Sequence, residues 1–151
     1  MTRIKLLIAT LAVFTLAGCT QNNGHIGRLF GSWVLEQAML NGVDMPMPAG
    51  TETYWSFQAD IVRVTLEEDH YAASSRYGTF RELPDGIIEL NFDHRDDANA
   101  EGAGAYAAPE WMGFPAKGVF NVQASGSGSK LKLVYQRSAD KIYEYYFTKT
   151  W

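Results

Sequence analysis

The sequence predicts an all-β protein built as one eight-stranded antiparallel up-and-down barrel, with one long loop before the sixth strand. Three observations support this prediction. Short runs rich in aromatic and β-branched residues recur along the chain between turn residues. Apolar and polar residues alternate inside these runs, which gives each strand one buried face and one wet face. All connections except one are short enough to join antiparallel neighbours, and closure of the sheet removes its exposed edges.

The alternation defines each strand and its buried face. In the third strand Val62 and Val64 share one face, whereas Arg63 lies on the other. Turn signals separate the strands: Asn-Gly at 41–42 follows the first, and Pro-Asp-Gly at 84–86 precedes the fifth. The expected strands span residues 32–40, 53–58, 61–67, 73–83, 87–92, 118–123, 131–136 and 142–149.

One connection is much longer than the others. Residues 93–117 separate the fifth and sixth strands, and loops of this length without structure are usually functional or disordered. Two interpretations remain open. In the first, the segment is an insertion with one short helical turn, whose Trp111 and Phe114 pack against the barrel. In the second, it is a lid or a partner-binding loop.

The N-terminus predicts export and lipid attachment. Arg3 and Lys5 precede an apolar run at 6–16, which is too short to span a bilayer. The run closes on Leu-Ala-Gly-Cys at 16–19, the pattern of a lipobox, where a bacterial lipoprotein is cleaved and acylated. We therefore expect a signal peptide at 1–18, a lipidated tether at 19–27 and a barrel domain at 28–151.

The lipobox also predicts where the protein resides. Two or three acyl chains on Cys19 would anchor the protein stably in a membrane. Thr20 follows the cysteine, so the aspartate that retains enterobacterial lipoproteins at the inner membrane is missing. We expect a lipid-anchored protein of the cell envelope, at the outer membrane and facing either the periplasm or the cell surface. Because Cys19 is the only cysteine, we expect no disulfide.

The net charge and the length of the chain limit the kinds of molecule that the protein is expected to bind. Removal of Arg3 and Lys5 with the signal peptide lowers the formal net charge from −4 to −6. A mildly acidic domain with scattered lysines argues against nucleic acid as a partner and against electrostatic docking on anionic lipid. The mature chain has the length of one domain, and we expect a monomer.

Short motifs give the chain a family resemblance. Gly31-Ser32-Trp33 resembles the Gly-x-Trp motif of lipocalins, in which the tryptophan closes one end of the barrel beneath a basic residue. The resemblance implies this closure for Gly31 and Trp33, with Lys149 above the ring in a cation–π contact. The chain is more similar still to the lipocalin-like lipoproteins of Bacteroidetes, which have a Trp-x-Phe strand and a Tyr-x-Phe-x-Lys ending. Residues 55–57 and 145–149 match these two motifs.

The resemblance covers nearly all of the mature chain. It implies a calyx-shaped barrel and a small apolar ligand, and it implies no known activity. The chain departs from typical lipocalins because it lacks the disulfide and has the long loop at 93–117.

Patterns for catalysis and metal binding are missing from the sequence. His25, His70 and His94 lie far apart, without a second ligand at the spacing of a metal site. There is no Gly-x-Ser-x-Gly elbow, and the serines at 125–129 belong to a turn in which a nucleophile would not be held in place. We therefore expect no enzymatic activity, no metal site and no cofactor.

Aromatic residues at inward positions are the remaining signal. An eight-stranded barrel either fills its interior with side chains or holds one small ligand, and both interpretations remain open. Tyrosines can supply the few polar groups that a ligand pocket needs. The residues expected to line a ligand site are Trp55, Phe57, Tyr77, Phe120, Tyr135, Tyr143 and Tyr145.

Two functions follow from the two kinds of interior. The preferred interpretation is a lipid-anchored binding protein of the cell envelope, whose barrel holds a small apolar ligand. The alternative is a structural or protein-interaction lipoprotein with a filled barrel, which docks an envelope protein through residues 93–117. An integral outer-membrane barrel is disfavoured, because such barrels need strands of about 9–11 residues with apolar outward faces.

Overall fold

The computed structural model describes residues 27–68, 72–93, 108–109, 112–125 and 127–151. These residues form strands joined by turns, and the connection from β5 to β6 is a short 3-10 turn, η2, at Pro84–Gly86. The predicted signal peptide and most of the predicted tether lie outside the described residues. The strands are β1 (Gly31–Leu40), β2 (Val43–Asp44), β3 (Thr51–Gln58), β4 (Ile61–Glu68), β5 (Ala72–Leu83), β6 (Ile87–Asn91), β7 (Lys117–Ala124), β8 (Lys130–Ser138) and β9 (Lys141–Lys149).

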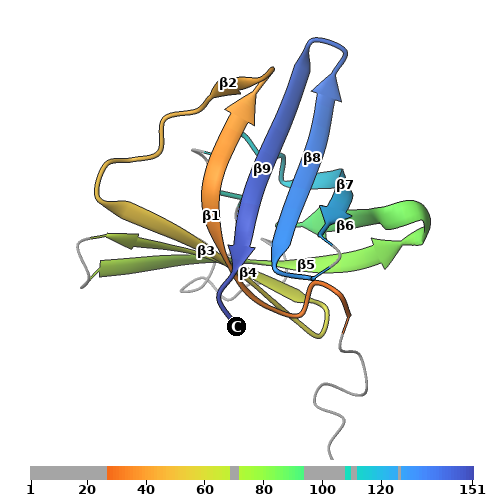
Figure 1. Cartoon of the computed structure of the whole chain (residues 1–151), viewed down its shortest axis with the longest axis horizontal. Helices are drawn as coiled ribbons and strands as arrows, with labels where there is room; N and C mark the ends of the chain where they lie inside the picture. Colours follow the sequence, from red (N-terminus) through yellow and green to blue (C-terminus); the bar gives the residue numbers. More distant parts are fainter. Residues whose placement is uncertain (1–26, 69–71, 94–107, 110–111, 126) are drawn as a thin grey trace, which may run out of the picture.

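The strands close into a barrel (Figure 1). From β3 to β9 each strand pairs antiparallel with the next, and β9 returns to pair with β1. The ring contains all strands except β2, which only extends the end of β1 through the pair Met39–Asp44. The prediction of an all-β, eight-stranded antiparallel barrel is therefore confirmed. The sequence pattern missed β2, because a strand of two residues is too short to show alternation.

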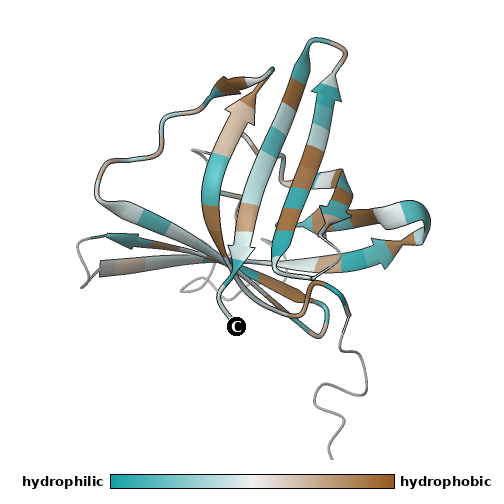
Figure 2. Cartoon of the chain, in the orientation of Figure 1, coloured by the Kyte–Doolittle hydropathy of each residue, from teal (hydrophilic) through white to brown (hydrophobic). Residues whose placement is uncertain are grey.

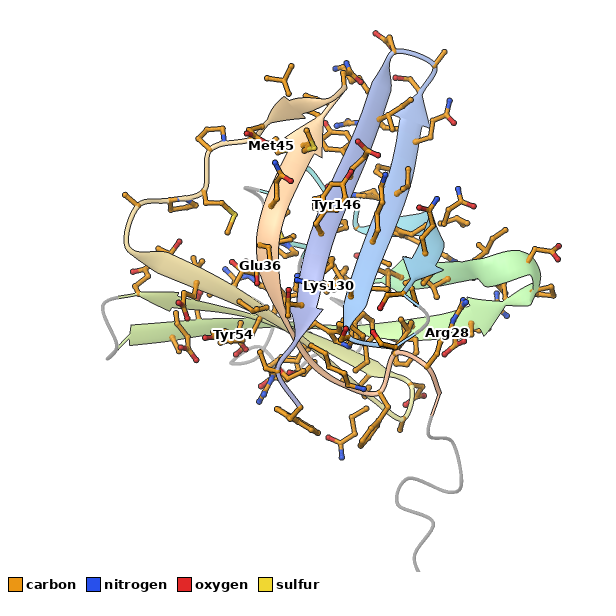
Figure 3. All side chains as sticks on the ribbon, in the orientation of Figure 1. Arg28, Glu36, Met45, Tyr54, Lys130 and Tyr146 are labelled. Carbon is orange, nitrogen blue, oxygen red and sulfur yellow. The ribbon has the colours of Figure 1, made fainter. Side chains whose placement is uncertain are left out.

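The barrel has two different ends. At the end that we call the closed end, β1 begins, β9 finishes, and short turns join β3 to β4, β5 to β6 and β7 to β8. The opposite end, which we call the loop end, holds the segment at 41–50 and the long connection between β6 and β7. Arg28 and Met45 mark the two ends in Figure 3.

Alternation along the strands places the core inside the ring. Trp33 pairs with Trp55 and Trp55 with Val64, so these three inward side chains form one row across β1, β3 and β4. On the other side of the ring Leu133 pairs with Tyr145. Figure 2 shows the alternation of hydrophilic and hydrophobic residues along β8 and β9. Burying one large apolar side chain stabilises the fold by about 1.5–3 kcal/mol, so the inward rows supply the main driving force.

The outer wall carries charged pairs. Glu89 on β6 accepts from Arg81 at 2.5 Å and from Lys117 at 2.9 Å. The hydrogen bond from Lys117, followed by that from Arg81, holds the pKa of the Glu89 carboxyl below its usual range. Because Arg81 and Lys117 are largely exposed to solvent, each pair contributes little to stability. Within the described part of the chain, no helix has the length and hydrophobicity needed to cross a membrane.

Candidate functional site in the barrel interior

Trp33 and its neighbours close the barrel at the closed end. The indole Nε1 of Trp33 donates to the backbone oxygen of Leu29 at 2.8 Å. Lys149 lies across the ring, with its Nζ 5.2 Å from the ring centre, which is the geometry of a cation–π contact. Gly31 has a φ of +119°, and a Cβ there would overlap the backbone oxygen of Trp151. The structure thus brings Gly31, Trp33 and Lys149 together at one end of the barrel.

Aromatic rings fill the middle of the barrel. The Trp55 ring centre lies 5.5 Å from Phe147 and 6.0 Å from Phe57. On the opposite wall a line of rings follows β7, β8 and β9, with centroid separations of 5.1 to 6.4 Å. Six of the seven predicted lining residues therefore belong to one interior cluster: Trp55, Phe57, Phe120, Tyr135, Tyr143 and Tyr145.

Tyr77 does not belong to this cluster, and its predicted inward position is wrong. Tyr77 pairs with the exposed Arg63, so it lies on the outer face of β5. The inward residue at this level is Gly78, where a Cβ would lie 2.7 Å from the ring of Phe92. Side chains alternate with a period of two, so one residue of error in parity moves a side chain to the other face.

A segment from the long connection enters the barrel. We call residues 112–115 the inner segment. Met112 is fully buried, and the Phe114 ring stacks on Tyr145 at 4.5 Å with an interplanar angle of 15°. Phe114 also lies 5.0 Å from the Trp55 ring centre and 5.2 Å from that of Phe120. The expected packing of Phe114 against the barrel is thus a contact inside it, whereas Trp111 lies outside the described residues.

Tyr145 ties the inner segment to β9. Its hydroxyl donates a hydrogen bond to the backbone oxygen of Met112. Burial raises the pKa of Tyr145 above its ordinary value, and the neighbouring Tyr143 and Tyr135 add to the increase. The hydroxyl therefore stays protonated and able to donate at physiological pH. The inner segment is held in place by this bond and by the ring contacts of Phe114.

Two buried polar atoms lack a partner. They are Oγ1 of Thr53 and Nε1 of Trp55, and neither forms a hydrogen bond with any described residue. Both residues are fully buried, and they lie two positions apart on the inward face of β3. An unpaired buried polar group costs about 1–3 kcal/mol. Thr53 was not among the predicted lining residues, although its position two residues before Trp55 places both side chains on the same face of the strand.

A positive charge lies on the same side of the barrel. Arg76 on β5 pairs with Val64, and Val64 pairs with Trp55, so the three residues form one inward row. Neighbouring residues in such a row are about 5 Å apart at their Cβ atoms, which places the Cβ of Arg76 about 10 Å from that of Trp55. Arg76 is half-buried. The wall formed by β3, β4 and β5 therefore contains polar groups, whereas the wall opposite presents stacked rings.

A groove lies on the outer surface, away from the aromatic cluster of the interior. This groove of about 400 Å³ runs beside β8 and β9, near the residues Glu36, Lys130 and Tyr146 labelled in Figure 3. Lys130 donates to Thr148 at 2.6 Å, and Lys132 pairs with Glu144 while lying 5.0 Å over the Tyr146 ring. The bond with Glu144 raises the pKa of Lys132 above its usual value. Neither of the two residues with unpaired buried polar atoms lines this groove, so the interior remains the better candidate for a ligand site.

The described residues contain no group of three histidine, cysteine or carboxylate side chains that would hold a metal ion. No protein-family model matches the sequence, and no curated protein matches it either. Solved structures do match in three dimensions. One is a lipocalin-like protein from Bacteroides uniformis, with a TM-score of 0.55 and 18% sequence identity, covering 82% of this chain and 99% of that one. The fold is lipocalin-like.

A second solved structure matches to a similar extent. It is an uncharacterized protein from Bacteroides eggerthii, with a TM-score of 0.56 and 16% identity, covering 80% of this chain and 98% of that one. At these identities the likeness concerns the fold. The chemistry of the lipocalin-like barrel therefore has to be argued from its own residues.

Proposed function

We propose that the protein is a lipid-anchored binding protein of the cell envelope, whose barrel takes up one small, largely apolar molecule that carries a polar group. One observation carries the proposal. The buried Oγ1 of Thr53 and Nε1 of Trp55 lack partners among the described residues. A ligand oxygen that accepts the Trp55 hydrogen and shares a hydrogen bond with the Thr53 hydroxyl would satisfy both groups.

The surroundings of this pair favour a particular ligand. Aromatic rings line the opposite wall, and a long apolar body would pack against them. Arg76 places a positive charge on the wall that holds Thr53 and Trp55. A carboxylate at one end of an apolar molecule would match this arrangement, because it only accepts hydrogen bonds and carries the opposite charge.

Such a ligand would replace the inner segment. Phe114 lies against the Trp55 ring, so a molecule that reaches Trp55 from the loop end takes the place of Phe114. The segment is held by the burial of Met112 and the ring contacts of Phe114, with about 1.5–3 kcal/mol for a fully buried large side chain, and by one hydrogen bond worth about 1 kcal/mol. A ligand that buries a comparable apolar area can therefore compete with it.

The lipid anchor is proposed from the lipobox at 16–19. Sγ of Cys19 displaces the phosphate headgroup of a phospholipid and forms a thioether with its diacylglycerol, while the thiol proton leaves with the phosphate. Water then cleaves the peptide bond between Gly18 and Cys19. A Cys19→Ser variant should remain unacylated and should leave the membrane fraction.

Native mass spectrometry of the acylated protein from its host membranes tests the binding proposal. We expect a bound small molecule in the wild-type protein and its loss in the double variant Thr53→Val with Trp55→Phe. The control is Thr65→Val, which removes a hydroxyl from the outer face of β4 and should retain the molecule. Ligand-free wild-type protein, together with a crystal structure in which only water bridges Thr53 and Trp55, would overturn the proposal.

A further inference from the structure

The closed end carries an exposed aromatic group. Trp151 is 65% exposed, the edge of its ring meets Phe30 at a centroid distance of 6.0 Å, and the two residues come from opposite ends of the described chain. The backbone joins them as well, because Ser32 donates to the oxygen of Trp151 at 3.3 Å. Trp151 is therefore held on the outside of the barrel and faces solvent.

A polar hollow lies beside this aromatic pair. It has a volume of about 640 Å³ and lies between the start of the described chain, the turn after β7 and the residues after β9. Arg28 and Lys149 supply its charged side chains, with serine hydroxyls from residues 125–129, and none of the described side chains that line it is a carboxylate. Arg28 is also paired with Glu82, with Nε 3.3 Å from Oε2. The hollow is therefore suited to an anionic group such as a phosphate.

The proposed anchor lies close to the same end. The described chain starts at Gly27, which lines the hollow, and Cys19 lies at most about 29 Å away even with the segment fully extended. The loop end is farther from the anchor, because β1 alone spans about 30 Å along its length. If the loop end contacted the membrane, the tether would have to be fully extended along the length of the barrel. If the closed end contacts the membrane, the tether can be short.

We propose that the closed end rests on the phospholipid bilayer that holds the anchor, with Trp151 and Phe30 at the level of the headgroups and a lipid phosphate in the hollow. This inference rests on the lipid anchor of the proposed function. Tryptophan favours the interface of a bilayer, because its ring is apolar and its N–H is polar. Without the signal peptide the protein has a net charge of −6, so a surface of anionic lipid would repel it. We therefore expect the closed end to rest on zwitterionic phospholipid.

This orientation has a consequence for binding. Figure 1 shows the C-terminus at the closed end and β2 at the loop end, on opposite sides of the barrel. With the closed end on the membrane, the loop end faces the aqueous side. A ligand would therefore reach the barrel from the aqueous phase or from a facing membrane, and not from the bilayer that holds the anchor.

Quenching of tryptophan fluorescence by brominated lipid tests the orientation. The full acylated protein is placed in phosphatidylcholine vesicles whose acyl chains carry bromine near the headgroups. We expect quenching of the wild-type protein to fall at least threefold in Trp151→Phe. A second variant, Val43→Trp with Trp151→Phe, moves the exposed indole to β2 at the loop end, where Val43 is 69% exposed, and should show equally little quenching.

Charge reversal tests the phosphate. Arg28→Glu should lower the quenching of Trp151 at least twofold, whereas Arg137→Glu, the same change of charge on the loop-end half of β8, should leave it unchanged. Equal effects of these two variants would show that the hollow does not bind phosphate.

Flotation with the vesicles separates this inference from the anchor. Wild-type protein that floats while Cys19→Ser does not, but shows no quenching of Trp151, would overturn the orientation and leave the anchor standing. Quenching of the variant with the indole at position 43 would do the same. Failure of the wild-type protein to carry acyl mass would overturn the anchor itself.

Discussion

Trp33 and Trp55 are direct neighbours across β1 and β3, and both are fully buried, yet their surroundings differ. Trp33 donates its N–H to Leu29 and lies beneath the ammonium of Lys149. The N–H of Trp55 has no partner among the described residues, and its ring contacts Phe114 from the long connection. The closed end is thus completed by its own backbone and side chains, whereas the interior next to it keeps unsatisfied polar atoms.

The difference between the two tryptophans suggests that one serves the stability of the barrel and the other its function. A satisfied buried group stabilises one conformation, and an unsatisfied one costs about 1–3 kcal/mol that selection for stability alone would remove. Such local conflicts are expected at functional sites. We therefore propose that Trp33 closes the barrel and that Trp55 recognises a ligand, and variants at the two positions should behave differently.

The most damaging substitution should be Gly31→Ala at the closed end. The backbone at Gly31 has a φ of +119°, which an alanine rarely adopts, and the new methyl group would overlap the Trp151 oxygen. Strain of this kind costs about 1–3 kcal/mol, and the overlap adds to it. We expect a loss of about 3 kcal/mol or more in the free energy of unfolding, measured by urea denaturation followed by circular dichroism.

The matched control for this substitution is Gly42→Ala. Gly42 also has a positive φ, +77°, but a Cβ there would meet nothing within 4 Å. It should cost about 1 kcal/mol, because only the backbone preference is lost. Equal losses at the two glycines would mean that close packing against Trp151 contributes nothing.

Replacing each tryptophan with phenylalanine tests the comparison directly. Trp33→Phe removes a hydrogen bond and leaves the oxygen of Leu29 unpaired, whereas Trp55→Phe removes an N–H that had no partner. Both variants lose similar ring volume, so we expect Trp33→Phe to be less stable than Trp55→Phe by about 1–3 kcal/mol. Urea unfolding of the ligand-free protein measures this difference, and the reverse order would contradict the assignment.

Alternation of apolar and polar residues predicted the strands well, because it is a local property of the sequence. The eight expected strands are present, and residues 31, 33 and 149 lie together as the family resemblance implied. The inward position predicted for Tyr77 was wrong for a physical reason. The ring of Phe92 leaves room only for a glycine at the inward position, and this constraint comes from outside the strand itself. The sequence Tyr77-Gly78 alone does not reveal this steric constraint.

The inner segment was beyond the reach of sequence patterns. Residues 93–117 have no regular period, so nothing local distinguishes packing of Phe114 on the outside of the barrel from insertion into it. Met112 belongs to the connection that the alternative function would use to dock an envelope protein, but its side chain is fully buried and offers no surface for docking. Threonine is common in strands, so its presence in a predicted strand does not indicate a buried hydroxyl that lacks a hydrogen-bond partner. For this reason Thr53 was not predicted as a site residue.

A smaller effect is expected for Tyr145→Phe, with a dependence on pH. At neutral pH the variant loses the hydrogen bond to Met112, worth about 1 kcal/mol. Because burial raises the pKa of Tyr145, the unfolded chain releases this proton first, and the wild-type protein loses about 1.4 kcal/mol per pH unit above about pH 10.

The phenylalanine variant cannot lose stability in this way. Its deficit should therefore shrink or reverse at pH 11 when the two proteins are unfolded in urea at pH 8 and pH 11. Tyr54, whose pKa is raised to about 12 by its hydrogen bond to Glu52, is present in both proteins and does not affect the difference. A deficit that is the same at the two pH values would show that Tyr145 is not shielded from solvent.

The smallest change in stability is expected for Thr53→Val. The substitution keeps the shape of the side chain and removes a hydroxyl without a partner, so the ligand-free protein should be equally stable or more stable by up to about 1 kcal/mol. The control Thr65→Val breaks the contact between Thr65 and Ser75 at 3.1 Å and should cost about 0.5–1.5 kcal/mol. Since the same hydroxyl at Thr53 is proposed to meet the ligand, the variant should gain stability while losing the bound molecule. A loss of stability as large as that of Thr65→Val would mean that Thr53 already has a partner, and the reason for placing a ligand beside it would be gone.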